Sequence, residues 1–260
     1  MMNTHTHRLP TVGVIVTHNS QEFLPELLAS ISNQIQQLDQ LIVIDDRSTD
    51  KTTSMLSEHG IIPTRAISVA TNITTRIAQN FQQGVRQAPP NSVVILGDHD
   101  DVWRPDRVEH QVRAFERAPM LAMLASDGQV NEIETLRTTF PIPVNWSAMS
   151  KKKQFTYALR HSIATGGASA IRPANLKDIN VPEGWLHDRW WSLAATARGR
   201  MALDTKIVIA YRITPEQQVG LDTANQGADR LAWLSGHARS AGVSAVKASE
   251  IMKLVIRARR

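Results

Sequence analysis

Short apolar runs and a stretch of helical periodicity alternate in the first half of the chain. Residues 12–16 (VGVIV) and 41–44 (LIVI) are continuous, β-branched apolar runs, which indicate strands buried on both faces. Between them, apolar residues recur every three or four positions, as in an amphipathic helix. They are Leu24, Leu27, Leu28, Ile31 and Ile35. We therefore predict a β-α-β unit in a parallel sheet, with residues 93–96 (VVIL) as a further strand.

The second half carries weaker signals. Residues 121–125 and 206–210 (KIVIA) predict two more strands, and residues 184–198 predict a helix whose adjacent tryptophans belong to the core. Prolines disfavour regular structure over residues 139–150, which we interpret as a loop over a site. Residues 165–170 (TGGASA) offer glycines where backbone could approach a ligand, although we favour a turn without ligand contact.

Polar side chains directly follow each of the three N-terminal strands. In open α/β sheets, ligands bind at the carboxyl ends of strands, so we expect the three groups to converge at one edge. The residues are Thr17, His18 and Asn19 after the first strand, Asp45 and Asp46 after the second, and Asp98, His99, Asp100 and Asp101 after the third.

The third group is the most informative, because three carboxylates fall within four residues. Like charges this close disfavour ionisation unless something positive lies among them. Hard divalent ions such as Mg²⁺ or Mn²⁺ take oxygen ligands, so the group is a candidate cation site that could also hold a diphosphate. The alternative is that these residues only cap the following helix. The residues alone leave both interpretations open.

Composition adds bounds rather than detail. The chain has 260 residues, 42% of them hydrophobic and 20% charged, as in an ordinary globular domain. Cysteine is absent, which excludes disulfides and thiolate metal sites and fits a reducing compartment. The first residues lack an apolar signal-peptide core, and no run of about 18 apolar residues occurs. We therefore expect a cytoplasmic protein that does not span a bilayer.

Positive charge gathers at the C-terminal end. The formal net charge is +5, and five basic residues lie within residues 247–260 against the single Glu250. Apolar residues recur there at helical spacing, so an amphipathic helix on an anionic membrane surface is one interpretation. A helix docked on its own domain with a solvated basic face is the other, and we favour it. Nucleic-acid binding is disfavoured, since the basic residues are not interleaved with aromatic ones.

Six segments, in this order, resemble glycosyltransferase family 2, the inverting GT-A enzymes, and within it the bacterial rhamnosyltransferase-like group that extends surface glycans. They are VGVIVTHNS, LIVIDDRSTDKT, NF within a small helix, LGDHDDVWRPDR, LHDRWW and YRITPEQQVG, between residue 11 and about residue 220. The resemblance implies an α/β fold of GT-A type, a Rossmann-like α/β/α sandwich with a mostly parallel central sheet. It also implies one domain over residues 1–225, with a nucleotide-sugar half (1–125) and an acceptor half (126–225), before a helical, basic tail (226–260).

The resemblance also assigns residues to the donor. It implies that Asp46, with Asp45 beside it, contacts the nucleotide base, since a carboxylate accepts hydrogen bonds from a pyrimidine N–H. His18 stands where many relatives carry Tyr and is expected to stack on the base. Arg76 is a candidate for the diphosphate, with a solvated helix position as the equal alternative. For Asp50 we favour a turn or helix-cap role.

For the chemistry, the resemblance makes Asp98 and Asp100 the acidic pair of a DXD signature that binds Mg²⁺ or Mn²⁺, with Asp100 as the direct ligand and Asp101 behind it. Asp188 matches the general base, although a helix cap is the alternative role. Thr214 departs from the family pattern, because related sequences carry His there near the metal.

The implied function is metal-dependent, inverting transfer of a hexosyl or deoxyhexosyl group. The donor would be a UDP- or dTDP-sugar, and the acceptor a glycan or lipid-linked hydroxyl in bacterial surface polysaccharide synthesis, at the inner face of the plasma membrane. Two alternatives stay open. One is a nucleotide- or glycan-binding module that has lost activity. The other is a sugar nucleotidyltransferase, although that class begins with a glycine-rich loop and the first segment here has only Gly13.

Overall fold

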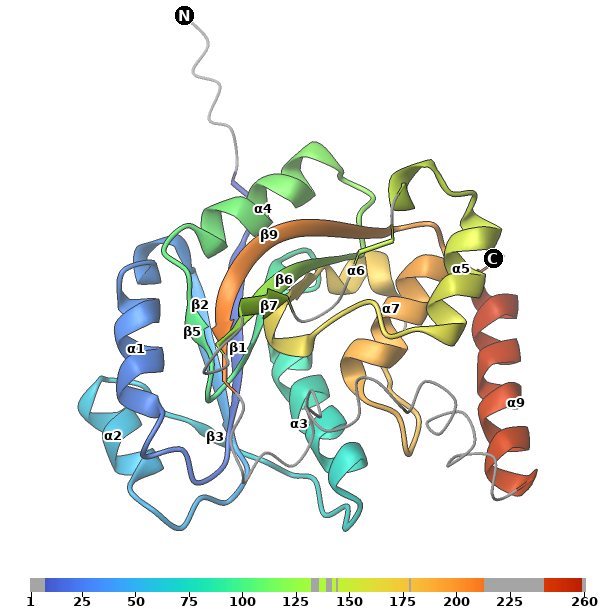
Figure 1. The fold of residues 1–260 in the computed structure, drawn as a ribbon. Coiled ribbons are helices and arrows are strands. Elements are labelled where there is room, and N and C mark those ends of the chain that lie inside the picture. The colour runs from blue at the N-terminus through green and yellow to red at the C-terminus, as the bar shows by residue number, and fades with distance from the viewer. Residues whose placement is uncertain are drawn as a thin grey trace, which may run out of the picture. The chain divides into compact units, whose positions relative to one another are not determined.

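The structure, a computed structural model, describes residues 8–131, 136–138, 142–143, 145–177, 179–212 and 241–258. The chain divides into two compact units, Met1–Arg212 and Ile213–Arg260. The first contains the sheet (Figure 1), and the described part of the second is the helix α9 (Ala241–Ala258). The expected domain boundary at residue 225 and the expected donor and acceptor halves stay predictions. Among the described helices, none is both long and apolar enough to cross a membrane.

The remaining elements belong to the first unit. Its strands are β1 (Thr11–Thr17), β2 (Gln40–Asp45), β3 (Thr64–Arg65), β4 (Val93–Asp98), β5 (Val102–Trp103), β6 (Met123–Asn131), β7 (Leu136–Thr138), β8 (Ser169–Ile171) and β9 (Met201–Tyr211). Its α-helices are α1 (Leu24–Ser32), α2 (Thr52–Glu58), α3 (Ile73–Gln87), α4 (Arg107–Arg117), α5 (Lys151–Arg160), α6 (Pro173–Leu176) and α7 (His187–Ala197). Three 3₁₀ turns are η1 (Ile35–Gln37), η2 (Trp146–Ala148) and η3 (Gly166–Ala168).

All the described strands form one sheet in the order β3-β2-β1-β4-β8-β6-β9-β5, with β7 paired to β6. The pairs β3–β2, β2–β1, β1–β4 and β6–β9 are parallel. Because β8 is antiparallel to both β4 and β6, β6 and β9 run in the same direction as β4. The strands β5 and β7 are antiparallel to their partners. The predicted α/β fold with a mostly parallel sheet is therefore confirmed.

Each predicted strand and helix exists, with shifted ends. The predicted strand at residues 121–125 is β6, and the one at 206–210 is part of the longer β9. The predicted helix at 184–198 is α7, which begins at His187 after a turn with Gly184 at φ 74°. Its two tryptophans are buried, as expected. Part of the expected irregular stretch over residues 139–150 lies outside the described residues, and the rest includes η2.

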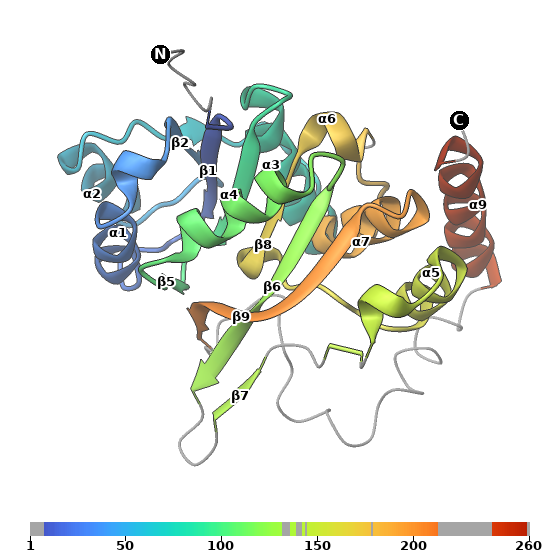
Figure 2. The ribbon, with the colours of Figure 1, turned by 90° about the horizontal axis from the view of Figure 1, so that it is seen from above.

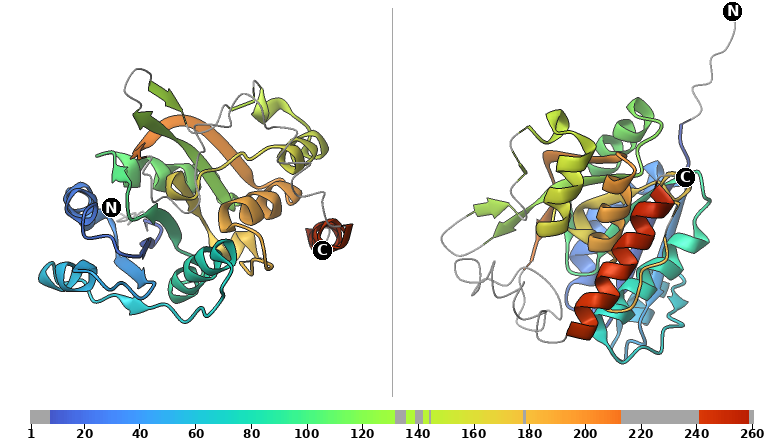
Figure 3. Two further views of the ribbon diagram at one scale, coloured as in Figure 1. Left: turned by 60° about the horizontal axis from the view of Figure 1, so that its bottom comes forward. Right: turned by 90° about the vertical axis from the view of Figure 1, so that its right-hand side faces the viewer.

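Helices cover both faces of the sheet. Figure 2 shows α1 and α4 on one face and α3 and α7 on the other. On the first face, the Gln34 side chain accepts from Val108 N at 3.0 Å and donates to Arg104 O at 2.8 Å, which ties the end of α1 to the start of α4. On the second, Gly184 N donates to Thr75 Oγ1 at 3.0 Å, and α3 and α7 lie side by side (Figures 1 and 3). Strand β1 is buried along its whole length, as a strand covered on both faces must be.

The helix α3 has clear sequence signals at both ends. Asn72 is its N-cap, and its side chain accepts a hydrogen bond from Thr75 N at 3.0 Å. The helix ends before Pro89, since Ala88 adopts an extended backbone (ψ 145°), as a residue before proline prefers. These signals fix where Arg76 stands in the first turn of α3.

Strand β9 connects distant parts of the sheet. It pairs with β6 over most of its length, with register irregularities near Asp127, and its far end pairs with β5. Irregularities of this kind bend a strand and increase its twist, and Figure 3 shows the resulting curvature of β9. The bend brings the last residues of β9 beside β5. In the sequence, β5 directly follows the acidic group at the end of β4.

We expect Gly84→Ala to destabilise the fold, because α3 presses against β1 at this position. A Cβ atom on Gly84 would lie 2.5 Å from Val14 Cγ1 and 3.3 Å from Ile44 Cγ1. Overpacking of a core costs about 1–3 kcal/mol, against a gain in helix propensity of about 1 kcal/mol. Urea unfolding should therefore show a lower free energy of unfolding. The exposed Ser57→Ala in α2 is the control, and a Gly84→Ala protein as stable as wild type would contradict this packing.

Candidate functional site

The carboxyl ends of β1, β2 and β4 meet at one edge of the sheet. The register places Thr17 beside Asp45 and Val16 beside Asp98. The polar groups that follow these strands therefore converge, as the strand-end argument predicts. The first two groups form one half of the candidate site, and the acidic group after β4 forms the other.

Thr17, Asn19 and Asp45 hold the two loops of the first half together. Asp45 is buried and accepts hydrogen bonds from Thr17 Oγ1 at 2.9 Å, Ser48 Oγ at 2.6 Å and Ser48 N at 3.0 Å. Asn19, at φ 46°, accepts from Thr49 N at 2.9 Å. The side chains of Asp45 and Asn19 are thus engaged in contacts within the protein. A contact between any of these three residues and a nucleotide stays a prediction.

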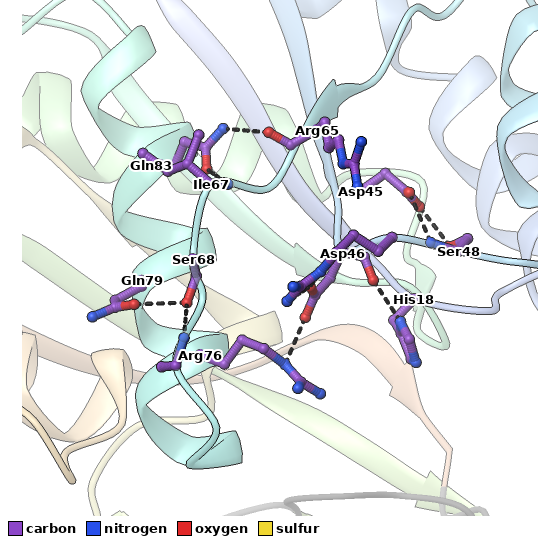
Figure 4. A network of polar contacts seen from close by, with 12 residues as sticks. His18, Asp45, Asp46, Ser48, Arg65, Ile67, Ser68, Arg76, Gln79 and Gln83 are labelled. Carbon is purple, nitrogen blue, oxygen red and sulfur yellow. Dashed lines mark hydrogen bonds and ion pairs between the residues drawn. The ribbon is translucent and has the colours of Figure 1, made fainter.

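Asp46 lies at the centre of a polar network (Figure 4). Its Oδ1 accepts from Arg47 Nε at 3.2 Å and Nη2 at 3.0 Å, and its Oδ2 pairs with Arg76 Nε at 2.9 Å. The ring of His18 lies beside it, with Nδ1 2.7 Å from the Asp46 carbonyl oxygen. That contact requires the proton on Nδ1, because a carbonyl only accepts. The structure thus brings Asp46, His18 and Arg76 together, and their roles toward a nucleotide stay predictions.

Arg47 is a member of this network that sequence reasoning missed. Its backbone has φ 58°, a left-handed conformation that non-glycine residues seldom adopt. That turn directs its guanidinium back onto Asp46. Asp50, in contrast, has a local turn role, since its carboxylate accepts from Thr52 N at 3.0 Å, just before α2, and from Gln21 N at 3.0 Å, while Lys51 is the N-cap of the helix.

The second half of the site is a crowded group of carboxylates at the end of β4. Burial, followed by the negative charges of Asp100 and Asp188, raises the pKa of Asp98 to about 7. Burial also raises the pKa of Asp101 well above its usual value, and the charges of Asp98 and Asp100 add to the effect. Asp101 is only 1% exposed, and neither of its carboxylate oxygens has a hydrogen-bond partner. The group therefore lacks sufficient positive charge of its own.

Arg107, at the start of α4, supplies positive charge on the buried side of the acidic group. Its guanidinium is fully buried, 4.2 Å from the centre of the Trp103 ring, and donates from Nε to Gln111 Oε1 at 3.2 Å and from Nη2 to Leu96 O at 2.5 Å. Its charge lowers the pKa of both Asp98 and Asp101. Sequence reasoning gave Arg107 no role, although its polar spacing with Gln111 on an otherwise apolar helix face was a signal.

The donor set of this group fits a hard divalent cation. Its oxygens are carboxylates, two of them without partners, and burial and mutual repulsion disfavour their ionisation. Within the described residues, no three His, Asp or Glu side chains are arranged to hold a metal ion by themselves. That matches the usual mode of Mg²⁺, which takes one or two carboxylates and completes its shell with water and substrate phosphates. Asp98 and Asp100 as the ligands stay a prediction.

Asp188 lies in the first turn of α7, close enough to Asp98 for its charge to raise the pKa of that residue. Burial raises the pKa of Asp188 itself to about 6, while hydrogen bonds from the backbone N–H groups of Arg189 and Gly166 oppose the shift. The Arg189 side chain donates to the carbonyls of Leu159 and His161, at 2.9 and 2.5 Å, and so attaches the start of α7 to the end of α5. The base candidate is therefore rigidly placed beside the acidic group.

His187 precedes Asp188 and is buried against the core. Its ring stacks on Phe81 with centroids 3.9 Å apart, and burial lowers its pKa to about 3. The ring is therefore neutral at physiological pH and does not compensate the negative charge of the acidic group.

The C-terminal part of the expected site is only partly described. Thr214 and the two glutamines that follow it lie outside the described residues. Arg212 pairs with Glu26 and lies 5.6 Å from the centre of the Phe23 ring. Its charge lowers the pKa of Asp101, so β9 brings a second arginine toward the acidic group.

Comparisons with known proteins show the family and the fold. A model of glycosyl transferase family 2 matches residues 14–179. TuaG of Bacillus subtilis (strain 168), named for a glycosyltransferase role in teichuronic acid biosynthesis, is 28% identical over 110 residues, which are 41% of this chain and 42% of TuaG.

Solved structures share the fold. S. aureus TarS (residues 1–349) in complex with UDP-GlcNAc has a TM-score of 0.62 at 15% identity, over 80% of this chain and 60% of that one. Glucosyl-3-phosphoglycerate synthase from Mycobacterium tuberculosis, in complex with Mn²⁺ and UDP-glucose, has a TM-score of 0.57 at 15% identity, over 80% and 73%. The chain spans less than two thirds of the length of TuaG and of TarS.

We expect the metal-free protein to lose stability as pH rises from 5 to 8. The pKa of Asp98 is raised from 3.8 to about 7 on folding, so between these values the folded state binds more protons than the unfolded state. Its contribution to stability is therefore full below pH 4 and is lost as pH rises through about 7. Asp98→Asn should flatten the decline of the thermal midpoint measured in chelator, where about 1 kcal/mol corresponds to roughly 2–4 °C.

Two comparisons make this measurement specific. Mn²⁺ should raise the midpoint more at pH 8 than at pH 5, because it binds the ionised carboxylates. Asp106→Asn is the control, since Lys206 lowers the pKa of Asp106 and its titration lies below this range. An unchanged slope in Asp98→Asn would contradict the electrostatic description of the site.

Proposed function

The chain belongs to glycosyl transferase family 2, and from that premise we propose that it is an inverting, metal-dependent glycosyltransferase. It transfers a sugar from a nucleoside diphosphate donor to a hydroxyl group of a glycan or lipid-linked acceptor. The observation that carries the proposal is that an acidic group, the separate half-buried carboxylate of Asp188 and the polar network around Asp46 lie at one sheet edge. The biological role is bacterial surface polysaccharide synthesis.

The donor nucleotide occupies the first half of the site. Asp46 accepts a hydrogen bond from the base, and the ring of His18 stacks on it or borders it. Arg76 presents the remaining nitrogens of its guanidinium to the diphosphate, because only its Nε is engaged with Asp46. Support comes from the relatives, since TarS was solved with UDP-GlcNAc and the mycobacterial synthase with UDP-glucose. A UDP-sugar is therefore the first donor to test, and a dTDP-sugar the second.

Asp98 and Asp100 hold the divalent cation, Mg²⁺ or Mn²⁺. When bound, that ion neutralises the charge that develops on the leaving diphosphate. The mycobacterial synthase was solved with Mn²⁺ and with Mg²⁺, which supports the choice of metal. Asp101 and Arg107 support the pair from the buried side without facing the donor.

Asp188 is the general base. It takes the proton of the acceptor hydroxyl as that oxygen attacks the anomeric carbon. The new carbon–oxygen bond forms on the face opposite the leaving group, and the electrons of the old bond pass to the diphosphate. The configuration therefore inverts. A pKa raised to about 6 leaves Asp188 ionised at neutral pH yet more basic than an ordinary aspartate.

Two other functions remain as outcomes of the tests. A module that only binds nucleotides or glycans would bind UDP without turnover. A sugar nucleotidyltransferase would instead require a nucleoside triphosphate and release pyrophosphate. The half-buried position of Asp188 beside the acidic group, where its pKa is raised to about 6, favours the transferase, because a binding module has no need of a base there.

We expect Asp188→Asn to lower kcat by about 10²- to 10⁴-fold, because general-base catalysis is lost. The dissociation constant of UDP in Mn²⁺ should stay within about twofold, since Asp188 does not contact the nucleotide. Nucleotide release from a panel of UDP- and dTDP-sugars measures turnover, and NMR of the product gives the anomeric configuration. In wild type, kcat/KM should rise with pH through about 6. A retained configuration, or full activity of Asp188→Asn, would refute the mechanism.

We further propose that the second unit brings the enzyme to an anionic membrane on the cytoplasmic side, where a lipid-linked acceptor lies. In α9, Met252 and Ile256 are 61% and 50% exposed and stand four residues apart on one stripe of the helix. Lys253 and Arg257 follow them directly and are exposed too. Apolar side chains bordered by basic ones are typical of helices that lie on anionic lipid.

Charge reversal tests this association. Lys253→Glu with Arg257→Glu should weaken binding to phosphatidylserine vesicles by more than about tenfold, since each basic residue near such a surface contributes about 1 kcal/mol. The matched control is Arg113→Glu with Arg117→Glu, the same spacing on an exposed face of α4. Vesicle sedimentation measures binding, and turnover of a soluble acceptor should be unchanged. Equal loss in both double variants would leave only non-specific attraction and end the proposal.

A further inference from the structure

Two consecutive glycines lie between the acidic group and the base candidate. Gly166 and Gly167 open the turn η3, which leads directly into β8. Strand β8 pairs antiparallel with β4, with Ala170 opposite Ile95. Continuing that register by three residues brings Gly167 level with Asp98, at the end of β4. The turn therefore reaches the acidic group because of a strand pairing that is distant in sequence.

Neither glycine leaves room for a side chain. A Cβ atom on Gly167 would lie 2.1 Å from Asp101 Oδ2 and 2.7 Å from Asp98 Oδ2. A Cβ atom on Gly166 would lie 2.6 Å from His187 Nε2 and 3.8 Å from Asp188 Cβ. The first glycine thus faces the start of α7, and the second faces the acidic group.

The backbone N–H groups of the same two residues contact the same two sides. The Gly166 N–H is a hydrogen-bond donor to Asp188, and the Gly167 N–H is a hydrogen-bond donor to Asp98. Adjacent Cα atoms across a planar trans peptide are about 3.8 Å apart and cannot stretch. Two consecutive peptide units, joined at the Gly166 Cα atom, therefore link the carboxylate proposed to take the proton to the carboxylate proposed to face the diphosphate and metal.

We propose that Gly166–Gly167 is a positioning element that sets the separation between the base Asp188 and the metal-side carboxylate Asp98. The inference rests on the proposed function, in which Asp188 acts on the acceptor and Asp98 on the leaving group. Glycine is required here for close approach and not for an unusual backbone, because neither residue is among the positive-φ glycines. Alanine is therefore allowed by the backbone, and the methyl group is the only change.

Replacing Gly166 should impair turnover, whereas replacing Gly167 should impair the effect of Mn²⁺ on UDP binding. Gly166→Ala displaces the peptide from the base side, so kcat should fall more than about tenfold while the UDP dissociation constant in Mn²⁺ stays within about twofold. Gly167→Ala displaces Asp98 and Asp101, so Mn²⁺ should strengthen UDP binding at least about tenfold less than in wild type. Its metal-free UDP binding should stay within about twofold, because the nucleotide network around Asp46 is untouched. Calorimetry measures binding, and nucleotide release measures turnover.

Gly84→Ala is the matched control, because it adds the same methyl group to a buried glycine that presses on β1 away from both carboxylates. It should lower the thermal midpoint and leave kcat and the effect of Mn²⁺ unchanged at temperatures where it is folded. If Gly166→Ala and Gly167→Ala behave like Gly84→Ala, with stability lost and neither parameter changed selectively, the positioning role is wrong.

If a single variant folds poorly, double variants that also remove the side chain in contact with the new methyl group keep the test decisive. His187→Ala removes the ring that a Gly166 methyl group would meet, so Gly166→Ala/His187→Ala should recover most of the kcat of His187→Ala alone. For the other side, Gly167→Ala/Asp101→Ala is compared with Asp101→Ala, and the effect of Mn²⁺ should still be weaker because Asp98 Oδ2 remains in the way. No recovery in the first pair and no difference in the second would overturn the proposal.

The design separates this proposal from the proposed function. A wild-type protein that binds UDP more tightly with Mn²⁺ but transfers no sugar would refute the transferase function. The Gly167 variants would then still report on the metal-side carboxylate. A wild type that transfers sugar, with Gly166→Ala and Gly167→Ala fully active, would refute the positioning role alone.

Discussion

Repulsion between carboxylates at the end of β4 is the constraint on which the arrangement of the site depends. Two unit charges 4 Å apart interact by about 4 kcal/mol at an effective dielectric constant of 20, which is enough to shift a pKa by several units. Burial, with the charges of Asp100 and Asp188 added to it, raises the pKa of Asp98 to about 7, and the buried Arg107 and the Gly167 N–H oppose this shift only in part. In the metal-free chain these carboxyls therefore hold protons to higher pH than ordinary aspartates, and a cation from outside would replace those protons.

Arg107 offsets part of the negative charge of this group. Its guanidinium is held by Leu96 O and Gln111 and by the Trp103 ring, so its position does not depend on the carboxylates. The charge of Arg107 lowers the pKa of Asp101, yet neither oxygen of Asp101 accepts a hydrogen bond from Arg107. Buried ion pairs contribute little to stability compared with apolar packing. The value of Arg107 is therefore better sought in the electrostatics of the site than in the stability of the fold.

The sequence indicates those parts of the site that follow from local rules. Strand-end chemistry places Asp45 and Asp98 at one edge, because the apolar runs before them predict parallel strands and parallel strands end together. Asp188 could be found only through the family resemblance, since a carboxylate in the first turn of a helix is also an ordinary cap. The role of Gly167 was not predictable, because it depends on the pairing of β4 with β8 across more than seventy intervening residues. Local patterns contain no information on such a pairing.

The nucleotide half of the site also contains contacts that the sequence does not predict. The motif marks Asp46 as an acceptor for the base, but its Oδ1 already accepts from Arg47 and its Oδ2 forms an ion pair with Arg76. A carboxylate has about four lone-pair positions, so a base N–H can join as a further donor. In the proposed donor complex Arg76 would therefore make two contacts, with Nε paired to Asp46 and its remaining nitrogens directed at the diphosphate. Base binding and diphosphate binding would then depend on one side chain, because Arg76 pairs with the same carboxylate that would accept from the base.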